Sequence, residues 1–176
     1  MQKIHAFNLL LLASLFVLSS CGNDDDATPP NVPNEIVVGT QSFTGTEGLI
    51  IDIGSLGTHY QYTIGISDAT LNTSSAGGFL FSTTASFVVS FGAASFGPNQ
   101  FQTGTFSFLS VIDTVPLDNY FFSGTFTNVD TGASSVMEGG TVTISGASPD
   151  FTMVFDVTLR NGEKITGAYV GSFQIQ

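Results

Sequence analysis

Few side chains of this sequence can do acid–base or nucleophilic chemistry. After the first 20 residues, His59 is the only histidine and Cys21 the only cysteine. A Ser-His-Asp arrangement would have to use His59, and no Gly-x-Ser-x-Gly sequence surrounds any serine. His59 opens an expected strand on the face opposite Tyr60 and Tyr62. We interpret it as a partly exposed structural residue and predict no catalytic residue.

Paired carboxylates are the remaining route to catalysis. Glycoside hydrolases use two carboxyl groups that lie roughly 5–10 Å apart. Asp52 and Asp156 each interrupt an apolar run, on the face opposite the expected core, so two outward carboxylates could meet from different strands. We interpret both as solvent-facing strand residues. A carboxylate-dependent glycan-acting enzyme stays as the alternative function.

The sequence predicts no metal site and no cofactor. A zinc site needs three or four His, Cys or carboxylate ligands, and this sequence offers a single suitable histidine. Calcium needs only oxygen ligands, but the nearest candidate, residues 113–119, lacks the spaced Asp-x-Asp-x-Asp-Gly pattern. The acidic run Asp24, Asp25 and Asp26 is interpreted as part of a solvated linker.

Composition limits the class of protein further. The 176 residues suit one domain, and only 10% of them are charged, against about 25% in ordinary soluble domains. Three Lys and Arg residues against 14 Asp and Glu leave a net charge of −11. Nucleic-acid binding needs a basic surface, so we expect no nucleic-acid partner. A single cysteine excludes an internal disulfide.

Residues 1–20 have the features of a bacterial signal peptide. Lys3 supplies a positive start, and the apolar stretch 9–18 is shorter than the roughly 20 residues of a membrane-spanning helix. The Leu-Ser-Ser-Cys sequence at residues 18–21 resembles the lipobox of bacterial lipoproteins. In that family the peptidase cuts before the cysteine, whose sulfur carries a diacylglycerol. The resemblance implies that Cys21 is lipidated and anchors the chain to a membrane.

Residues 21–35 are expected to form a disordered tether, because they contain three prolines and almost nothing to bury. The acidic run Asp24, Asp25 and Asp26 resembles the surface-export signal of lipoproteins in Bacteroidetes-type bacteria. Gly22, rather than an aspartate, follows the cysteine, so the retention rule for the inner membrane does not apply. The resemblance therefore implies an outer-membrane lipoprotein displayed on the cell surface.

Residues 36–176 are predicted to form one all-β domain. Apolar residues alternate in short runs broken by Gly, Asn, Asp, Ser and Pro, so each strand has one buried and one solvent face. About nine or ten such runs indicate an antiparallel β-sandwich, with a closed, lipocalin-like β-barrel as the alternative. Residues 93–100 and 113–119 are expected loops. Two of the expected core rows are Leu49, Ile51 and Ile53, and Tyr120, Phe122 and Phe126.

Asn161-Gly162 predicts a tight turn near the C-terminus. A two-residue loop would direct Ile165 toward solvent, because a shift of one residue exchanges the two faces of a strand. A three-residue loop instead pairs Leu159 with Glu163 and keeps Ile165 inside. We predict the three-residue loop, with a bulge and with Gly162 at positive φ. This register also places aromatic residues over cross-strand glycines: Phe155 over Gly167 and Phe151 over Gly171.

The C-terminal part of the chain carries a second resemblance. Residues 139–144, 151–159 and 161–171 look like the C-terminal end of small all-β lipoproteins common in Bacteroidetes-type bacteria, and the lipobox and acidic tether match as well. The resemblance implies location and β architecture, but no reaction and no functional residues. We expect a lipid-anchored binding or structural module, with a glycan or a protein as its ligand.

Lipidation gives a direct test. The membrane-bound protein should incorporate labelled palmitate, and Cys21→Ala should abolish this labelling because no other thiol is available. The measurement is metabolic labelling followed by precipitation of both forms. Labelling that persists in the alanine variant would contradict the lipoprotein interpretation.

Overall fold

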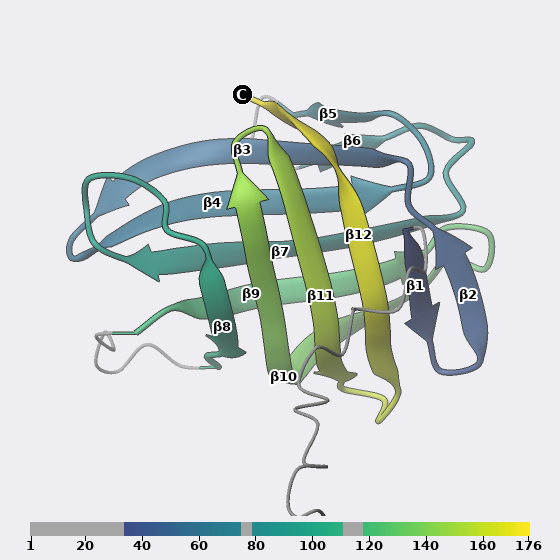
Figure 1. Cartoon of the computed structure of the whole chain (residues 1–176). Helices are drawn as coiled ribbons and strands as arrows, with labels where there is room; N and C mark the ends of the chain where they lie inside the picture. The colour runs from purple at the N-terminus through teal and green to yellow at the C-terminus, as the bar shows by residue number, and fades with distance from the viewer. Residues whose placement is uncertain (1–33, 75–78, 111–117) are drawn as a thin grey trace, which may run out of the picture. The chain divides into compact units, whose positions relative to one another are not determined.

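The computed structural model describes residues 34–74, 79–110 and 118–176, drawn in colour in Figure 1. These residues form β-strands and no helix, which confirms the all-β prediction. The strands are β1 (Glu35–Val38), β2 (Gln41–Thr44), β3 (Glu47–Leu56), β4 (His59–Ser67), β5 (Leu71–Thr73), β6 (Phe79–Phe81), β7 (Phe87–Phe96), β8 (Gly104–Phe108), β9 (Tyr120–Asn128), β10 (Ala133–Ala147), β11 (Asp150–Leu159) and β12 (Lys164–Ile175).

Hydrogen bonds join most of these strands into a closed circuit. Its order is β10-β9-β7-β4-β3-β12-β11, and β11 pairs again with β10. β8 lies between the second half of β10 and the start of β9, and the β1–β2 hairpin lies beside the first half of β12. The ladder therefore closes as in a barrel. Two strand pairings are parallel: β3–β12, which belongs to the circuit, and β8–β9, which lies beside it. The sequence predicts antiparallel pairing throughout.

The closed sheet has two walls that face each other, as in a sandwich. In Figure 1, β3, β4, β7 and β9 run across the view, and β11, β12 and the second half of β10 cross in front of them. Phe91 of β7 meets Phe155 of β11 edge-to-face, with ring centroids 6.0 Å apart. Strands that pass from one wall to the other at bulges are typical of this crossed arrangement.

One apolar cluster fills the space between the walls. It contains rows that the alternation predicts, such as Phe87, Val89 and Phe91 on β7, and Phe151, Met153, Phe155, Val157 and Leu159 on β11. In the described part of the chain, every buried side-chain nitrogen or oxygen has a hydrogen-bond partner. The interior is thus a packed core, which contributes about 25 cal/mol per Å² of apolar surface removed from water.

The last hairpin has the predicted register. Leu159 donates its backbone N–H to the Glu163 carbonyl at 2.8 Å, and Gly162 donates to the Leu159 carbonyl at 2.9 Å. Gly162 has a φ of +85°, and Ile165 is fully buried opposite Val157. The three-residue loop is therefore confirmed.

The two glycines of this hairpin have different close neighbours from those predicted. Phe155 pairs with Gly167 and Phe151 with Gly171, as expected. However, the atoms nearest to a Cβ placed on Gly167 belong to the backbone of Glu35 in β1, and those nearest to one on Gly171 belong to the ring of Tyr169. Gly167 thus gives β1 room to approach β12.

The expected face of β3 is wrong. Ile50 lies in the core, whereas Leu49 packs on the outer face against Leu71 and Val88, and Ile53 is 53% exposed. The first half of β3 is therefore buried on both faces: the core covers one face, and the outer cluster that includes Leu71 of β5 covers the other. Alternation cannot choose a buried face where both faces are covered.

The expected row on β9 is divided by a bulge. Phe121 and Phe126 lie in the core, but Tyr120 and Phe122 point to the other face. The register with β7 shifts between Ser90 and Gly92, and Ser123 takes a positive φ of 51°. The extra residue reverses the alternation, so the three residues do not share a face.

The expected loop at residues 93–100 begins later than predicted. β7 continues to Phe96 and pairs with β4 as far as His59. Ala93 and Ala94 are fully buried under larger neighbours, among them Phe121. Because these positions need small side chains, the sequence lacks the usual bulky strand signal here.

β10 changes walls at two adjacent glycines. Its residues 133–136 pair with β9, its residues 141–144 pair with β8, and the register with β11 shifts between Met137 and Gly139. Gly140 has a φ of +94°, and a Cβ there would lie 2.1 Å from the Asp156 carbonyl oxygen. A Cβ on Gly139 would meet the Thr158 Cβ at 4.0 Å, an ordinary van der Waals distance.

These neighbours give a matched pair of substitutions. Gly140→Ala should lower the free energy of unfolding by about 2–4 kcal/mol, because it combines a backbone clash with a strained φ. Gly139→Ala should change it by less than about 1 kcal/mol. Urea unfolding of the two variants measures both values. Equal effects at the two positions would contradict the wall-crossing geometry of β10.

Candidate functional site

Several residues singled out in the sequence lie outside the described part of the chain. These are the lipidation residue Cys21, the acidic residues Asp24, Asp25 and Asp26, and residues 113–117 of the weak calcium candidate. Among residues 34–74, 79–110 and 118–176, no three His, Cys, Asp or Glu side chains are grouped so that they could hold a metal ion.

The two candidate carboxylates do not form a pair. Asp156 is exposed on the outer face of β11, where the Lys164 ammonium lies 2.9 Å from its Oδ1. Asp52 is also exposed, but it pairs with Tyr62 in the register of β3 and β4 and so shares the core-facing side. The prediction that both face away from the core is therefore wrong for Asp52. The two side chains lie on different faces and have separate partners.

His59 is buried, which corrects the expectation of a partly exposed residue. Its relative exposure is 0%. Its Nε2 donates to the Asp118 carbonyl at 3.1 Å, and its Nδ1 lies 3.0 Å from the Thr58 hydroxyl. The rings of Phe96 and Tyr120 pack edge-on against it. Its neighbours use both ring nitrogens, so His59 ties β4 to the start of β9.

A groove of about 340 Å³ opens where the two walls meet at one end of the barrel. We call it the rim groove. Three parts of the chain line it: β4, the link between β7 and β8, and the turn from β10 to β11. Its lining residues are Tyr60, Tyr62, Gln100, Phe101, Gln102, Thr103, Gly146, Ala147, Ser148 and Phe151.

Aromatic stacking fixes the inner wall of the rim groove. Phe101 stacks on Tyr62 with centroids 4.1 Å apart and planes 12° from parallel, and it stacks on Phe106 at 5.5 Å and 5°. Tyr60 meets Tyr62 edge-on at 5.9 Å. Offset and edge-on ring pairs are favoured by about 0.5–1.5 kcal/mol beyond the burial of their surface. These contacts hold the link between β7 and β8 against the core.

Hydrogen bonds hold the same link at its backbone. Gln102 donates its backbone N–H to the Ser95 hydroxyl at 2.9 Å, and Gly97 donates to the Thr58 carbonyl at 2.9 Å. Phe96 donates to the Asn119 side-chain oxygen, also at 2.9 Å. Gln100 and Gln102 are exposed, so their side-chain amides border the groove with donors and acceptors.

Asp52 stands beside the rim groove and binds a residue that lines it. Its Oδ2 accepts the Tyr60 hydroxyl at 3.1 Å, and its Oδ1 accepts the Gly54 backbone N–H at 2.9 Å. Asp52 pairs with Tyr62, so Tyr60 is its diagonal neighbour on the same face; the register of β3 and β4 shifts just after Asp52. The hydrogen bond to Asp52 first, and then desolvation and the charge of Asp52, raise the pKa of the Tyr60 phenol.

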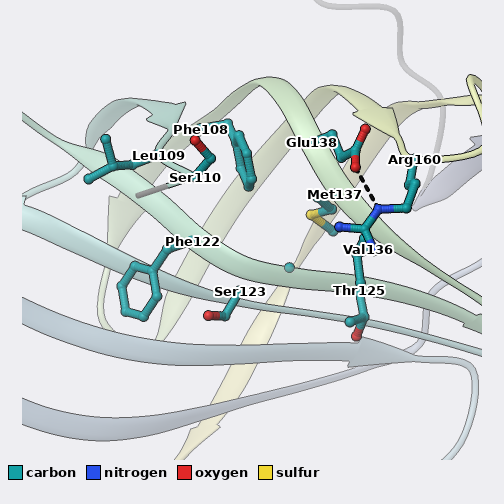
Figure 2. Close-up of a pocket in the computed structure, with 11 residues that line it drawn as sticks. Phe108, Leu109, Ser110, Phe122, Ser123, Thr125, Val136, Met137, Glu138 and Arg160 are labelled. Atoms are coloured by element: carbon teal, nitrogen blue, oxygen red, sulfur yellow. Dashed lines mark hydrogen bonds and ion pairs between the residues drawn. The ribbon is translucent and has the colours of Figure 1, made fainter. Parts of the chain in front are cut away.

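Two larger grooves flank the junction of β8 and β9. One, of about 580 Å³, is shown in Figure 2: Phe108, Phe122 and Met137 give it apolar walls, and the Arg160–Glu138 ion pair, at 2.6 Å, stands at one end. The other, of about 680 Å³, includes Phe96 and Tyr120 among its lining residues. Both grooves include a residue that adjoins 111–117, outside the described part of the chain. None of the residues that line the rim groove is adjacent to residues 111–117.

The rim groove can bind a ligand by two kinds of contact. Tyr60 offers aromatic surface, whereas the ring of Phe101 is already stacked on Tyr62 and Phe106. Gln100, Gln102 and Ser148 offer polar groups that both donate and accept hydrogen bonds. Small-ligand sites join aromatic surface to a few placed polar groups, and the surface of the rim groove is as much polar as apolar. The geometry supports binding and orientation of a ligand.

Sequence reasoning missed most of this site. It identified the row of Tyr60 and Tyr62 but assigned the row to the core, and it did not single out Phe101, Gln100 or Gln102. The available signal was the expected loop at 93–100, which leads directly into Phe101. Loops often carry binding residues.

Comparison with known proteins gives no relative to guide the assignment. No protein family model, curated protein or solved structure matches this chain. In the part of the chain that the structure describes, no helix is long and apolar enough to cross a membrane.

The Tyr60–Asp52 bond predicts a titration. Asp52→Asn should lower the pKa of Tyr60 toward the ordinary value of about 10, because it removes the carboxylate charge and weakens the acceptor. Since the pKa is raised in the folded state, the stability from this bond is present below about pH 10 and is lost as pH rises through the folded pKa.

The measurement is an NMR titration of the four tyrosines labelled at the ring carbon that bears the hydroxyl. Asp156→Asn is the matched control, and it should leave the Tyr60 titration unchanged. A Tyr60 titration that is unaffected by Asp52→Asn would contradict the bond.

Proposed function

We propose that this chain is a lipid-anchored protein of the outer membrane whose β-domain is displayed at the cell surface and binds a ligand without transforming it. The lipobox that ends at Cys21 and the acidic run Asp24, Asp25 and Asp26 support the anchor and the surface location. Glu35 belongs to β1, so the tether predicted over residues 21–35 ends earlier than expected. It would separate the domain from the membrane.

The observation that carries the binding function is the rim groove. Its aromatic wall is fixed by stacking on the core, and exposed amides border it. A site built on rigid elements binds with less loss of conformational entropy than one that must first become ordered. Its volume of about 340 Å³ falls in the range of small-ligand sites.

Binding without turnover fits the placement of the ionisable groups. Glycoside hydrolysis uses two carboxyl groups that flank one bond, and Asp156 lies on the outer face of β11 while Asp52 lies at the groove. His59 is engaged by Asp118 and Thr58. These placements favour the binding module over the glycan-acting enzyme.

Crosslinking on intact cells tests this function. Lipidation would consume the sulfur of Cys21, so Gln102→Cys would give the chain a single free thiol, placed at the rim groove. A thiol-reactive benzophenone attached there should form conjugates with envelope material on illumination. Val154→Cys, a position on β11 that is 42% exposed, is the matched control and should form few conjugates.

Two results would count against the proposal. If neither thiol reacts with a membrane-impermeant reagent on intact cells, surface display is wrong. If both positions form conjugates equally, the rim groove is not the ligand site.

A further inference from the structure

We propose that the rim groove binds an uncharged saccharide, which lies on the ring of Tyr60 and whose hydroxyls bond to Asp52 and to the amides of Gln100 and Gln102. This inference rests on the proposed function and names the chemical class of its ligand.

The groove offers the two kinds of surface that a sugar ring presents. A pyranose has faces made of C–H bonds and an edge of hydroxyl groups. The face of an aromatic ring carries partial negative charge, which attracts the slightly positive hydrogens of C–H bonds. Amide side chains donate and accept hydrogen bonds, as hydroxyl groups do. Tyr60 supplies the aromatic face, because Tyr62 and Phe106 already stack on Phe101. Gln100 and Gln102 supply the amides.

Asp52 keeps free acceptor sites for a ligand. A carboxylate has about four acceptor positions, and the structure gives Asp52 one bond on each oxygen, from Gly54 and from Tyr60. The carboxylate is exposed, so a sugar hydroxyl can reach it. A hydrogen bond to a charged group is about twice as strong as a neutral one. Asp52 therefore both orients Tyr60 and can hold a hydroxyl.

Charge disfavours an anionic saccharide. After residue 20 the chain holds two basic and fourteen acidic side chains, a formal charge of −12. The two basic residues, Arg160 and Lys164, pair with Glu138 and Asp156, away from the rim groove. A uronic acid or a sulfated sugar would meet Asp52 with no neighbouring cation to offset the repulsion.

The size of the groove suits a small ligand. The rim groove is a recess of about 340 Å³ bordered by ten residues, within the range of small-ligand sites. A short oligosaccharide fits this dimension.

The test uses the purified full chain in a zwitterionic detergent micelle, because detergents with sugar headgroups would compete for the site. The probes are maltohexaose, cellohexaose, xylohexaose, the chitin hexasaccharide and, as the anionic comparison, hexagalacturonate. Titration calorimetry measures affinity, and an assay for new reducing ends runs on the same samples. We expect at least one neutral hexasaccharide to bind at least about ten times more tightly than hexagalacturonate, because the anion meets Asp52 unpaired.

Three variants assign the contacts, and each is checked by its near-ultraviolet spectrum and thermal midpoint. Tyr60→Ala should weaken binding at least about tenfold because the aromatic platform is lost. Tyr60→Phe keeps the ring and the packing, and it should stay within about threefold of the wild type. Asp52→Asn should weaken binding about three- to tenfold, and the control Asp156→Asn should leave it unchanged.

Each of the remaining outcomes would contradict a different part of the proposal. If no saccharide binds while the groove position still forms conjugates on cells, or if the conjugate is a protein, the saccharide class is wrong and the binding function stands. If Tyr60→Ala binds as the wild type does, the site is wrong. Equal affinity for hexagalacturonate contradicts an uncharged ligand, and new reducing ends contradict binding without turnover.

Discussion

The parallel contact between the last strand and the first long strand holds the rest of the structure together. Phe173 and Ile175 of β12 pair with Gly48 and Ile50 of β3. The backbone of Gln176 extends this contact, since it donates to Ile50 at 3.0 Å and accepts from Asp52 at 2.9 Å. Without this contact the start of β3 and the end of β12 would each leave backbone groups unpaired on the side that now faces the other strand. Gln176 thus also holds the backbone of Asp52, whose carboxylate lies beside the rim groove.

Closure has a second consequence, because a closed sheet of this size brings its two walls into contact. Phe91 and Phe155 meet across the interior, and the rows on β7 and β11 fill the remaining space. A lipocalin-like cavity would need smaller side chains at these positions, or a wider barrel. The ligand that we propose would therefore lie outside this packed core, at the rim or on an outer face. The aromatic residues of the sequence serve mainly to fill the interior.

Much of the fold could be predicted from the sequence wherever one physical rule acted alone. The hairpin at Asn161-Gly162 is such a place, since turn chemistry and the burial of Ile165 agree on one register. β3 is not such a place, because its start is buried on both faces, and alternation there is compatible with either face toward the core. β9 is not either, because the bulge at Ser123 reverses the faces without any change in composition. The parallel closure has no local signal at all.

The candidate site could not be predicted for a related reason. Phe101 follows an expected loop, and only the tertiary structure shows that it stacks on Tyr62 about forty positions earlier in the chain. Asp52 looks like a surface carboxylate in the sequence, and only the pairing of β3 with β4 shows that its side chain reaches Tyr60. The hydrogen bond and the stack both need β3, β4 and β7 to be neighbours in the sheet.

This dependence separates the parts of the site that must stay constant from those that can vary. Tyr62 and Phe101 belong to the packing of the barrel, so replacing either would disturb the core as well as the groove. Gln100, Gln102 and Ser148 are exposed, and their side chains can change at little cost to stability. Selectivity for a ligand can therefore be set by these three residues while the core keeps the aromatic wall in place. A site with a fixed apolar wall and replaceable polar borders is the kind of arrangement on which one fold can support several specificities.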